Sequence, residues 1–439
     1  MHNLRWTVFG AAGLLLVATG LHGQNWPQFR GPNASGVSEG AKLPVAWDVV
    51  AGKNVRWKAA VPGFGFSSPV VWGDRIFLTT AVEIEGGQRS WRLLALDRET
   101  GKIVWERAPV AVLPPKIGKH EKASFANSTP ATDGQRIAAV LGESELWMFD
   151  FTGKELWKQD LGPLDPGFAR DATSHWGYGS SPVLDDGRVY VQVDRHANSF
   201  LAAFDAATGR QIWRARRDEL SSWATPVLAS GGAELVTSGV SFIRGYDPKT
   251  GEELWRYASG APVKVPTPVL AGDLVVIAGG YPRGQPLVAL RPGGRGDVSD
   301  KPGEPSPFLA WHTDRGGPYV PSPIVYQDRL FFCTDAGRVY SYDAKTGRPI
   351  FRGEVAGSFS ASPVAGDGKI YLASEEGDLY VVKAGDRLEI LATSSMDEPV
   401  MATPAISGDT LFIRTREHLY AIAEGHEEKA EKKEVKPAI

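Results

Sequence analysis

Short apolar runs alternate with polar residues along most of the chain, and turn-forming residues bound nearly every run. Residues 73–78, 186–191 and 366–372 show the pattern, in which Gly and Asp come first and a strand rich in Ile, Val, Phe and Tyr follows. Gly and Asp tolerate the positive φ of a tight turn, whereas β-branched and aromatic residues favour the flanking strands. The pattern therefore predicts many short β-hairpins.

These hairpins belong to a repeat. A Ser/Thr-Pro-apolar triplet opens each copy, and consecutive triplets are roughly 40 to 60 residues apart, a period typical of propellers and other repeat folds. The eight triplets are residues 68–70, 129–131, 181–183, 225–227, 267–269, 322–324, 362–364 and 403–405. We therefore expect one domain built from eight copies of a unit, rather than the two or three domains that 439 residues suggest.

Two further features recur within the copies. A third strand ends in Asp and a turn containing Thr-Gly, at residues 97–101, 205–209, 247–251 and 343–347, with a shortened version at 150–153. A fourth strand ends in a large apolar residue, and these residues are Trp105, Trp157, Trp213, Trp255, Trp311 and Phe351, with Leu391 the weakest match. Four antiparallel strands with a fixed aromatic describe a propeller blade. The predicted fold is all-β: an eight-bladed β-propeller of four-stranded antiparallel blades.

The last copy, residues 403–423, has room for three strands only. Residues 54–57 form an isolated fourth-strand phrase that ends in Trp57, ahead of the first triplet. We expect this N-terminal strand to complete the last blade and close the ring, which removes exposed sheet edges and suits a monomer. Two regions interrupt the period: an insertion at 106–124, and a long loop at 291–308 in place of the Thr-Gly turn of the fifth blade.

The chain ends differ from the repeats. Arg5, the apolar residues 6–18 and the small residues near 20–24 predict a cleaved signal peptide over 1–23, because the apolar run is short for a membrane span. No cysteine lies near the cleavage region, which excludes lipid attachment there. We expect the propeller over 24–424 and a disordered, charged tail over 425–439. The mature protein is expected to be exported, periplasmic or secreted, without a transmembrane segment.

Composition excludes several classes of function. The 50 Gly and 31 Pro fit a turn-rich fold, and a net charge of −3 gives no electrostatic reason to expect a nucleic-acid partner. The single cysteine, Cys333, excludes an intramolecular disulfide, a Cys-rich zinc site and a CxxCH haem attachment, and we expect it to be a buried apolar residue. The scattered histidines (His120, His175, His196 and His312) lack zinc-ligand spacing, so we predict no metal site.

The phrase Ala-x-Asp-x-x-Thr-Gly-Lys/Arg-x-x-Trp occurs at 95–105 and 203–213, and with Gly245 replacing Ala at 245–255. It resembles the tryptophan-docking repeat of quinoprotein propellers, which is shared by pyrroloquinoline-quinone (PQQ) dehydrogenases and by BamB, a non-enzymatic lipoprotein of outer-membrane β-barrel assembly. Residues 26–33, 291–297 and 317–323 are similar to a group of exported PQQ-like repeat proteins of bacteria. The resemblance implies the eight-bladed fold, but a repeat specifies activity poorly.

The dehydrogenase branch implies a cofactor. Such an enzyme holds PQQ between a Trp and a disulfide of adjacent cysteines, with calcium bound by Glu, Asn and Asp and with an aspartate base. A chain with one cysteine cannot form that disulfide, and we find no acidic cluster suited to calcium. Asp185-Asp186 and Glu375-Glu376 are interpreted as equivalent hairpin turns. We expect no cofactor and assign no catalytic residue, with PQQ and calcium as the alternative.

Residues just before each triplet are expected at the entrance of the innermost strands, where propellers usually bind their ligands. They form an aromatic-rich set with a few polar groups: Phe66, Asn127, Tyr178, Trp223, Lys264, Tyr319, Phe359 and Met401. This set is typical of a recognition mouth, and the alternative is that the aromatics simply plug the channel. The irregular segment 165–179, with Arg170, His175 and Trp176, is a further binding candidate. Segments 194–199 and 217–219 either join the same face or are solvated loops.

These observations favour an exported, non-catalytic binding or scaffold propeller. Its expected partner is an envelope protein, as the BamB resemblance implies, or a small ligand. The alternative is a PQQ-dependent oxidoreductase, or a small-ligand binder at the mouth of the axial channel.

Overall fold

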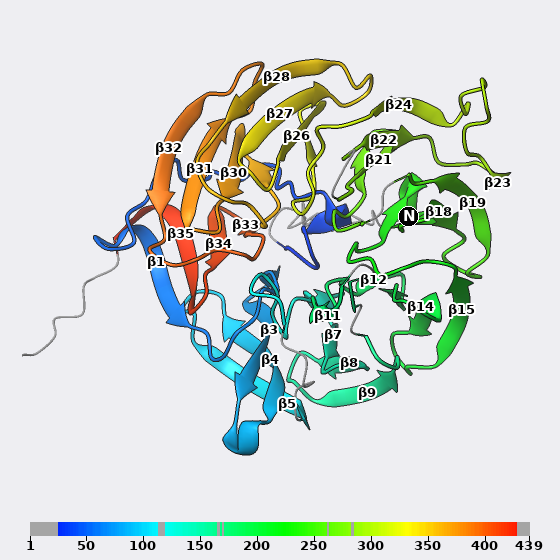
Figure 1. The fold of residues 1–439 in the computed structure, drawn as a ribbon. Helices are drawn as coiled ribbons and strands as arrows, with labels where there is room; N and C mark the ends of the chain where they lie inside the picture. Colours follow the sequence, from blue (N-terminus) through cyan, green and yellow to red (C-terminus); the bar gives the residue numbers. More distant parts are fainter. Residues whose placement is uncertain are drawn as a thin grey trace, which may run out of the picture.

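Eight antiparallel β-sheets are arranged in a ring around a central axis, as expected from the eight triplets (Figure 1). The computed structural model describes residues 25–112, 119–164, 167–168, 171–260, 263–281 and 285–427. The predicted signal peptide, Arg170 and most of the predicted tail lie outside these residues. Among the residues described, no helix is both long and apolar enough to cross a membrane.

Each of the first four blades follows its triplet. Blade 1 consists of β2 (Val70–Trp72), β3 (Arg75–Glu83), β4 (Arg89–Asp97) and β5 (Ile103–Val112). Blade 2 consists of β6 (Ala131–Thr132), β7 (Arg136–Leu141), β8 (Glu145–Asp150) and β9 (Glu155–Asp160). Blade 3 consists of β12 (Val183–Asp185), β13 (Arg188–Val193), β14 (Ser199–Asp205) and β15 (Gln211–Arg217). Blade 4 consists of β16 (Val227–Ala229), β17 (Glu234–Ser238), β18 (Phe242–Tyr246) and β19 (Glu253–Ala258), with β23 (Gly296–Asp297) added at its edge.

The other four blades complete the circle. Blade 5 consists of β20 (Val269–Ala271), β21 (Leu274–Ala278), β22 (Leu287–Leu290) and β24 (Leu309–Thr313). Blade 6 consists of β25 (Ile324–Tyr326), β26 (Arg329–Cys333), β27 (Arg338–Asp343) and β28 (Pro349–Glu354). Blade 7 consists of β29 (Val364–Gly366), β30 (Lys369–Ala373), β31 (Asp378–Lys383) and β32 (Ile390–Ser395). Blade 8 consists of β33 (Ala405–Ser407), β34 (Thr410–Arg414), β35 (His418–Glu427) and β1 (Lys53–Ala60).

A few short elements lie outside the blades. The segment 165–179, expected to be irregular, contains a hairpin of β10 (Gly167–Phe168) and β11 (Asp171–His175). The described part of the chain also contains three 3-10 turns: η1 (Pro32–Ala34), η2 (Glu85–Gly87) and η3 (Ser230–Gly232). The first seven residues of the predicted insertion at 106–124 extend β5, and β35 continues three residues into the segment assigned to the tail.

The N-terminal strand closes the ring, as predicted. β1 pairs antiparallel with β35, so that Trp57 lies opposite Ala421, and the blue and red ends of the chain meet in blade 8 (Figure 1). The junction with blade 1 is held by the buried Arg414, whose guanidinium donates to the Ser67 carbonyl and hydroxyl and to the Thr79 carbonyl. Closure therefore depends on both a shared sheet and a buried cross-blade contact.

The Ser/Thr of each triplet links neighbouring blades around the axis. Its backbone N–H donates to the side-chain hydroxyl of the next triplet at 2.9 to 3.3 Å. Seven consecutive bonds of this kind run through residues 68, 129, 181, 225, 267, 322, 362 and 403. This bond explains the recurrence of Ser or Thr, because a hydroxyl is both a hydrogen-bond acceptor and small enough for the place where the inner strands converge.

Fourth-strand tryptophans dock each blade on the next. Their indole Nε1 atoms donate at 3.0 to 3.1 Å to carbonyl oxygens in or beside the turn between the third and fourth strands of the following blade. The five residues are Trp57, Trp105, Trp157, Trp213 and Trp311. Each indole also packs over the glycine of that Thr-Gly turn, where a Cβ would lie within 3 Å of the ring.

Trp255 is the exception, and the sequence explains why. Blade 5 has a long loop instead of the Thr-Gly turn, so the indole of Trp255 turns inward and donates to Glu234 at 2.7 Å. It lies against Gly245, where a Cβ would be 2.2 Å from Nε1, so the Ala of the other repeats cannot stand there. The loop itself supplies β23, which pairs parallel with β19 and covers the edge of blade 4. Blade 4 therefore has five strands rather than the expected four.

The segment before β1 crosses the middle of the ring and closes one end of the axis (Figure 1). Trp26 pairs with Val71 of blade 1, and the Pro27 carbonyl accepts from Thr132 of blade 2 at 2.8 Å. On the far side, the buried Arg30 donates to the Pro323 carbonyl of blade 6 at 2.5 Å. These contacts lie toward the end of the axis at which first and second strands are joined.

Candidate functional site

An axial cavity of about 250 Å³ lies at the opposite end of the ring, which we call the mouth face. Residues from all eight triplets line it: Ser68, Thr129, Ser181, Thr225, Thr267, Ser322, Ser362 and Thr403. Phe29, from the segment that crosses the axis, also lines the cavity. The channel is therefore closed from one end by main chain and hollow at the other.

Trp223 forms a fixed part of the wall beside blades 3 and 4. Its Nε1 donates to the Gly177 carbonyl at 2.8 Å, and its backbone N–H donates to the Lys264 carbonyl at 2.8 Å. A Cβ on Gly179 would lie 3.0 Å from the indole, so the ring rests directly on that backbone. Because both the backbone and the side chain are bonded, the indole presents one orientation to the cavity.

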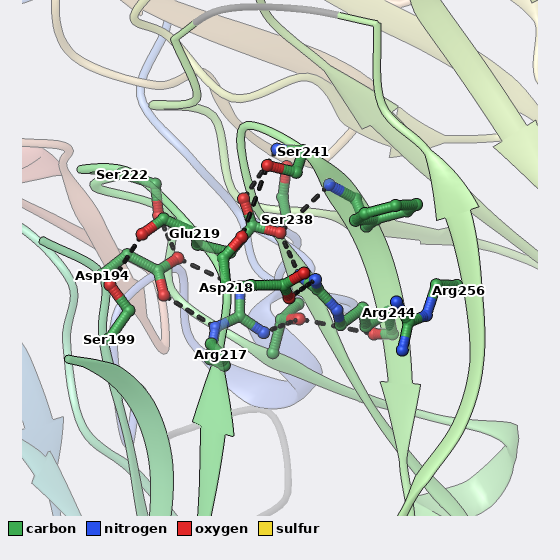
Figure 2. Close-up of polar contacts among 12 residues, drawn as sticks. Asp194, Ser199, Arg217, Asp218, Glu219, Ser222, Ser238, Ser241, Arg244 and Arg256 are labelled. Carbon is green, nitrogen blue, oxygen red and sulfur yellow. Dashed lines mark hydrogen bonds and ion pairs between the residues drawn. The ribbon is translucent and has the colours of Figure 1, made fainter. Parts of the chain in front are cut away.

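A buried ionic network supports the loop that carries Trp223 (Figure 2). Arg217 and Asp194, both fully buried, form a two-point contact at 2.7 and 3.0 Å. Asp194 also accepts from the Ser222 hydroxyl at 2.6 Å, next to Trp223 in sequence. Bidentate, hydrogen-bonded ion pairs of this kind hold geometry well when buried. Asp194 and Arg217 are thus structural supports rather than members of a solvated loop.

The same network continues into blade 4. Arg244 is fully buried and contacts Glu219 and the more exposed Asp218 (Figure 2). Its Nε also lies 3.1 Å from a carboxylate oxygen of Glu253. Glu219 also accepts from the backbone N–H groups of Ser241 and Phe242, at 2.6 and 3.0 Å. Burial raises the pKa of Glu219 against the opposing effect of Arg217. These residues fix the turn between β17 and β18.

Residues 119–127, which we call the strap, cross the mouth face. The strap runs beside β11, where the backbone N–H of His120 donates to the His175 carbonyl at 3.0 Å. The His120 ring stacks on Trp176, with ring centroids 3.9 Å apart. Lys122 reaches across the opening to blade 7 and pairs with Glu375 at 2.9 Å. The strap therefore joins blades far apart in the ring over the cavity.

Two carboxylates form the wall beside blades 6 and 7. Asp335 follows β26 and Glu375 follows β30, each in the turn between second and third strands. Glu375 is mostly buried, and it also accepts from the Ser360 hydroxyl at 2.6 Å. The sequence interpretation of Glu375-Glu376 as equivalent to Asp185-Asp186 was wrong. Asp185-Asp186 join the first and second strands of blade 3, at the end opposite the mouth, whereas Glu375-Glu376 join the second and third strands of blade 7. The two pairs can be told apart only when the strands of each blade are assigned.

Four of the predicted binding residues come together in the axial cavity: Asn127, Trp176, Trp223 and Tyr319. Phe66 and Met401, from the wider mouth set, line it too. The remaining predicted residues described by the structure do not line it. His175 is half-buried under the strap, and Tyr178 donates its hydroxyl to the Gln192 carbonyl at 2.9 Å. Phe359 packs against Tyr380. Burial lowers the pKa of Lys264 to about 8.

A second cavity of about 260 Å³ adjoins the first. The two share Phe66, Lys122, Glu375 and Met401, and the second adds residues from blade 8 and the strap, such as Glu121 and Arg416. The combined space runs from the axis outward along the mouth face. A ligand seated at the axis therefore has room to extend toward the rim.

Comparison with known proteins gives the family. A family model described as outer membrane protein assembly factor BamB matches residues 33–150, 92–292 and 308–425. BamB of Burkholderia pseudomallei (strain K96243) is 24% identical over 205 residues, which cover 38% of this chain and 48% of that protein. A polyvinylalcohol dehydrogenase of Sphingopyxis sp. (strain 113P3) is 24% identical over 184 residues, 37% of this chain and 24% of that protein. The aligned part thus spans less than half of each relative.

A solved structure shows the same fold. A europium-containing methanol dehydrogenase superposes with a TM-score of 0.67 at 12% identity, over 90% of each chain. Both the scaffold and the dehydrogenase branches expected from the repeat are therefore among the similar proteins. Since the family model matches well over half of the residues, the chain belongs to the PQQ-like propeller family of outer membrane protein assembly factor BamB.

Proposed function

We propose that the protein is an exported, non-catalytic binding propeller of the cell envelope, which holds its partner or ligand at the mouth face. The single observation that carries this proposal is the one-ended axial cavity. Main chain closes one end, whereas loops from several blades and the strap shape the other. Its walls are fixed by internal hydrogen bonds, as in Trp223, and preorganised walls are typical of a binding site.

The PQQ-dependent oxidoreductase is the second candidate, since dehydrogenases are among the similar proteins. The residues present do not fit that cofactor. PQQ carries three carboxylic acids. Among the described residues, the cavity wall carries the carboxylates Asp335 and Glu375 and one cation, Lys122, which is already paired with Glu375. Among the residues that the structure describes, no group of three His, Cys, Asp or Glu side chains is placed to hold a metal ion. We therefore derive no catalytic step.

The relation to BamB supports an envelope partner for this chain. The name of those relatives assigns them to assembly of outer membrane proteins. The loop faces of a propeller are its usual contact surfaces, and here the mouth face carries the axial cavity that residues of all eight triplets line. A protein partner at this face is consistent with both observations.

Two measurements test the proposal. In the first, PQQ with calcium chloride is added to the purified chain, and the melting temperature and alcohol-dependent dye reduction are followed. We expect neither to change, and a PQQ-dependent rise in melting temperature with dye reduction would favour the enzyme.

The second measurement is site-specific photocrosslinking in an exported form of the chain. A photoreactive residue replaces Tyr281, which is 43% exposed and stacks on Tyr319 at the mouth. The matched control replaces Val50, which is 83% exposed and lies just before β1, at the other end of the blades. We expect an envelope-protein adduct from position 281 and none from position 50. Equal adducts from both positions would contradict a binding face at the mouth.

A further inference from the structure

The two sides of the axial cavity differ in chemistry. Trp176 and Trp223 precede blades 3 and 4, and Asp335 and Glu375 belong to blades 6 and 7. Because the blades follow one another in chain order around a ring of eight, blade 3 stands across the axis from blade 7 (Figure 1). One side of the cavity is thus built from indole rings, and the opposite side carries carboxylates.

The charge on the acidic side is only partly compensated. Glu375 is neutralised by Lys122 at 2.9 Å and further bonded to Ser360. Asp335 is half-buried, and its carboxylate has neither an ion pair nor a hydrogen bond to any of the described residues. Its backbone carbonyl is occupied by the N–H of Phe359 at 3.0 Å. The described lining therefore carries one uncompensated negative charge, held by Asp335.

The negative charge of Asp335 also affects a neighbour in the wall. The pKa of Tyr319 is raised to about 12, mainly by burial, and Tyr281 and Asp335 add to the effect. Asp335 and Tyr319 both line the axial cavity, where charges interact more strongly than in bulk water. The same field attracts a cation that enters the cavity, and it repels an anion.

Aromatic walls favour the same kind of ligand. The faces of Trp and Tyr rings carry negative charge density, so they attract ammonium groups and pack against the hydrocarbon attached to them. The lining provides Trp176, Trp223 and Tyr319 for this purpose. A bare metal ion would instead need several converging ligand atoms, and the described residues offer no group of three acidic, His or Cys side chains.

We propose that the axial cavity binds an organic ammonium group, with its charge beside Asp335 and its hydrocarbon against Trp176 and Trp223. This assignment rests on the proposed binding role of the mouth face and names the chemistry of its ligand. The ammonium group comes either from a free amine or from a lysine side chain of a polypeptide. The second cavity, which continues outward past Met401, accommodates the remainder of either.

Titration calorimetry on the full mature chain tests the proposal with two probes, cadaverine and the peptide acetyl-Gly-Lys-Gly-amide. Each has a neutral partner: diacetylated cadaverine, and the same peptide with its lysine acetylated. We expect at least one probe to bind below about 5 mM and its neutral partner to bind at least tenfold more weakly. Tighter binding of cadaverine would identify a free amine, and tighter binding of the peptide would identify a lysine side chain.

A matched pair of variants locates the charge. Asp335→Asn removes it from the cavity, and Asp328→Asn makes the same change in the turn at the other end of the same blade. We expect Asp335→Asn to weaken binding at least tenfold and Asp328→Asn to leave it unchanged. Binding that is equal in both variants, or no binding of either probe, would overturn the ammonium assignment. An adduct at position 281 in the crosslinking experiment would then still support the binding face, so the two proposals fail separately.

Discussion

The indole of Trp223 is bonded to the carbonyl oxygen of Gly177 across 46 residues of sequence, at 2.8 Å. This contact sets one wall of the axial cavity and joins the loops that enter blades 3 and 4. It predicts that Trp223→Phe, which keeps an aromatic ring and loses the N–H, destabilises the fold by about 1 kcal/mol. Urea unfolding measures the change. Trp223→Phe without loss of stability would mean that the hydrogen bond does not hold this wall.

A substitution at the contact that closes the ring should lower the free energy of unfolding by more than Trp223→Phe does. Arg414 is fully buried and makes three hydrogen bonds to Ser67 and Thr79 of blade 1. We expect Arg414→Lys to lower the free energy of unfolding by about 3 kcal/mol, since a lysine cannot reproduce those bonds and leaves a buried charge with too few hydrogen bonds. The control is Arg352→Lys in the outer strand β28, which is well exposed and should change stability little. Equal effects of both changes would contradict the role of Arg414 in closure.

The segment that closes the axis depends on a glycine. Gly31 has φ of +68°, and a Cβ there would lie 2.5 Å from the Trp26 ring. Gly40 has φ of +74° and nothing within 4 Å of such a Cβ. Gly31 also has ψ of −151°, in a backbone region that is essentially confined to glycine, so Gly31→Ala combines backbone strain with displacement of Trp26 and should cost roughly 3 kcal/mol. Gly40→Ala meets no neighbour and should cost only about 1 kcal/mol for its positive φ. Denaturation midpoints compare the two variants, and equal midpoints would contradict the tight crossing.

The Thr-Gly turns predict a pH dependence. The carboxylate of Asp343 accepts from the Thr346 hydroxyl at 2.7 Å and from its N–H at 2.9 Å, and these bonds hold its pKa below the ordinary value. The folded state therefore binds fewer protons than the unfolded chain. Stability from this turn is complete above the unfolded-state pKa of about 3.9 and is lost as the pH falls through the lower folded-state pKa.

The threonine hydroxyl makes the largest contribution to that shift, so Thr346→Val should move the pKa of Asp343 upward. Carbon-13 NMR titration of the carboxyl carbon measures it. The reciprocal control is Thr208→Val, which should raise the pKa of Asp205 and leave Asp343 unchanged. An unchanged pKa of Asp343 in Thr346→Val would contradict this account of the turn.

The fold could be predicted because each repeat carries its own local signals. The hydroxyl at each triplet, the Asp and Thr of each turn and the docking Trp all act within one blade or between neighbours. The different orientation of Trp255 could also have been predicted. Gly245 replaces Ala in its repeat, and the following blade lacks the Thr-Gly turn on which the indole would otherwise dock. Turn residues with a known conformational role, repeated at a nearly constant spacing, are compatible with few folds other than a propeller.

The site was only partly predictable. The position of Asn127, Trp176, Trp223 and Tyr319 follows from the repeat phase, because residues ahead of an inner strand must lie near the axis. The closure of the axis did not follow, since it depends on contacts such as Arg30 to Pro323, nearly 300 residues apart. The place of Asp335 could not be predicted, because acidic residues occur in turns at both ends of the blades, and only the number of preceding strands puts this one at the mouth.

The central claim is that a cationic ligand enters the axial cavity, and fluorine NMR tests it most directly. The chain is labelled with 5-fluorotryptophan, and the signals of Trp223 and Trp176 are assigned from the variants Trp223→Phe and Trp176→Phe. On addition of cadaverine or the lysine peptide, we predict that both signals shift, whereas the signal of Trp311, buried and bonded to Ala344 at the other end of the blades, stays in place. We also predict that both shifts disappear in the Asp335→Asn variant, because the charge that binds the ammonium group is then removed. Unmoved Trp223 and Trp176 signals at saturating probe would contradict the account.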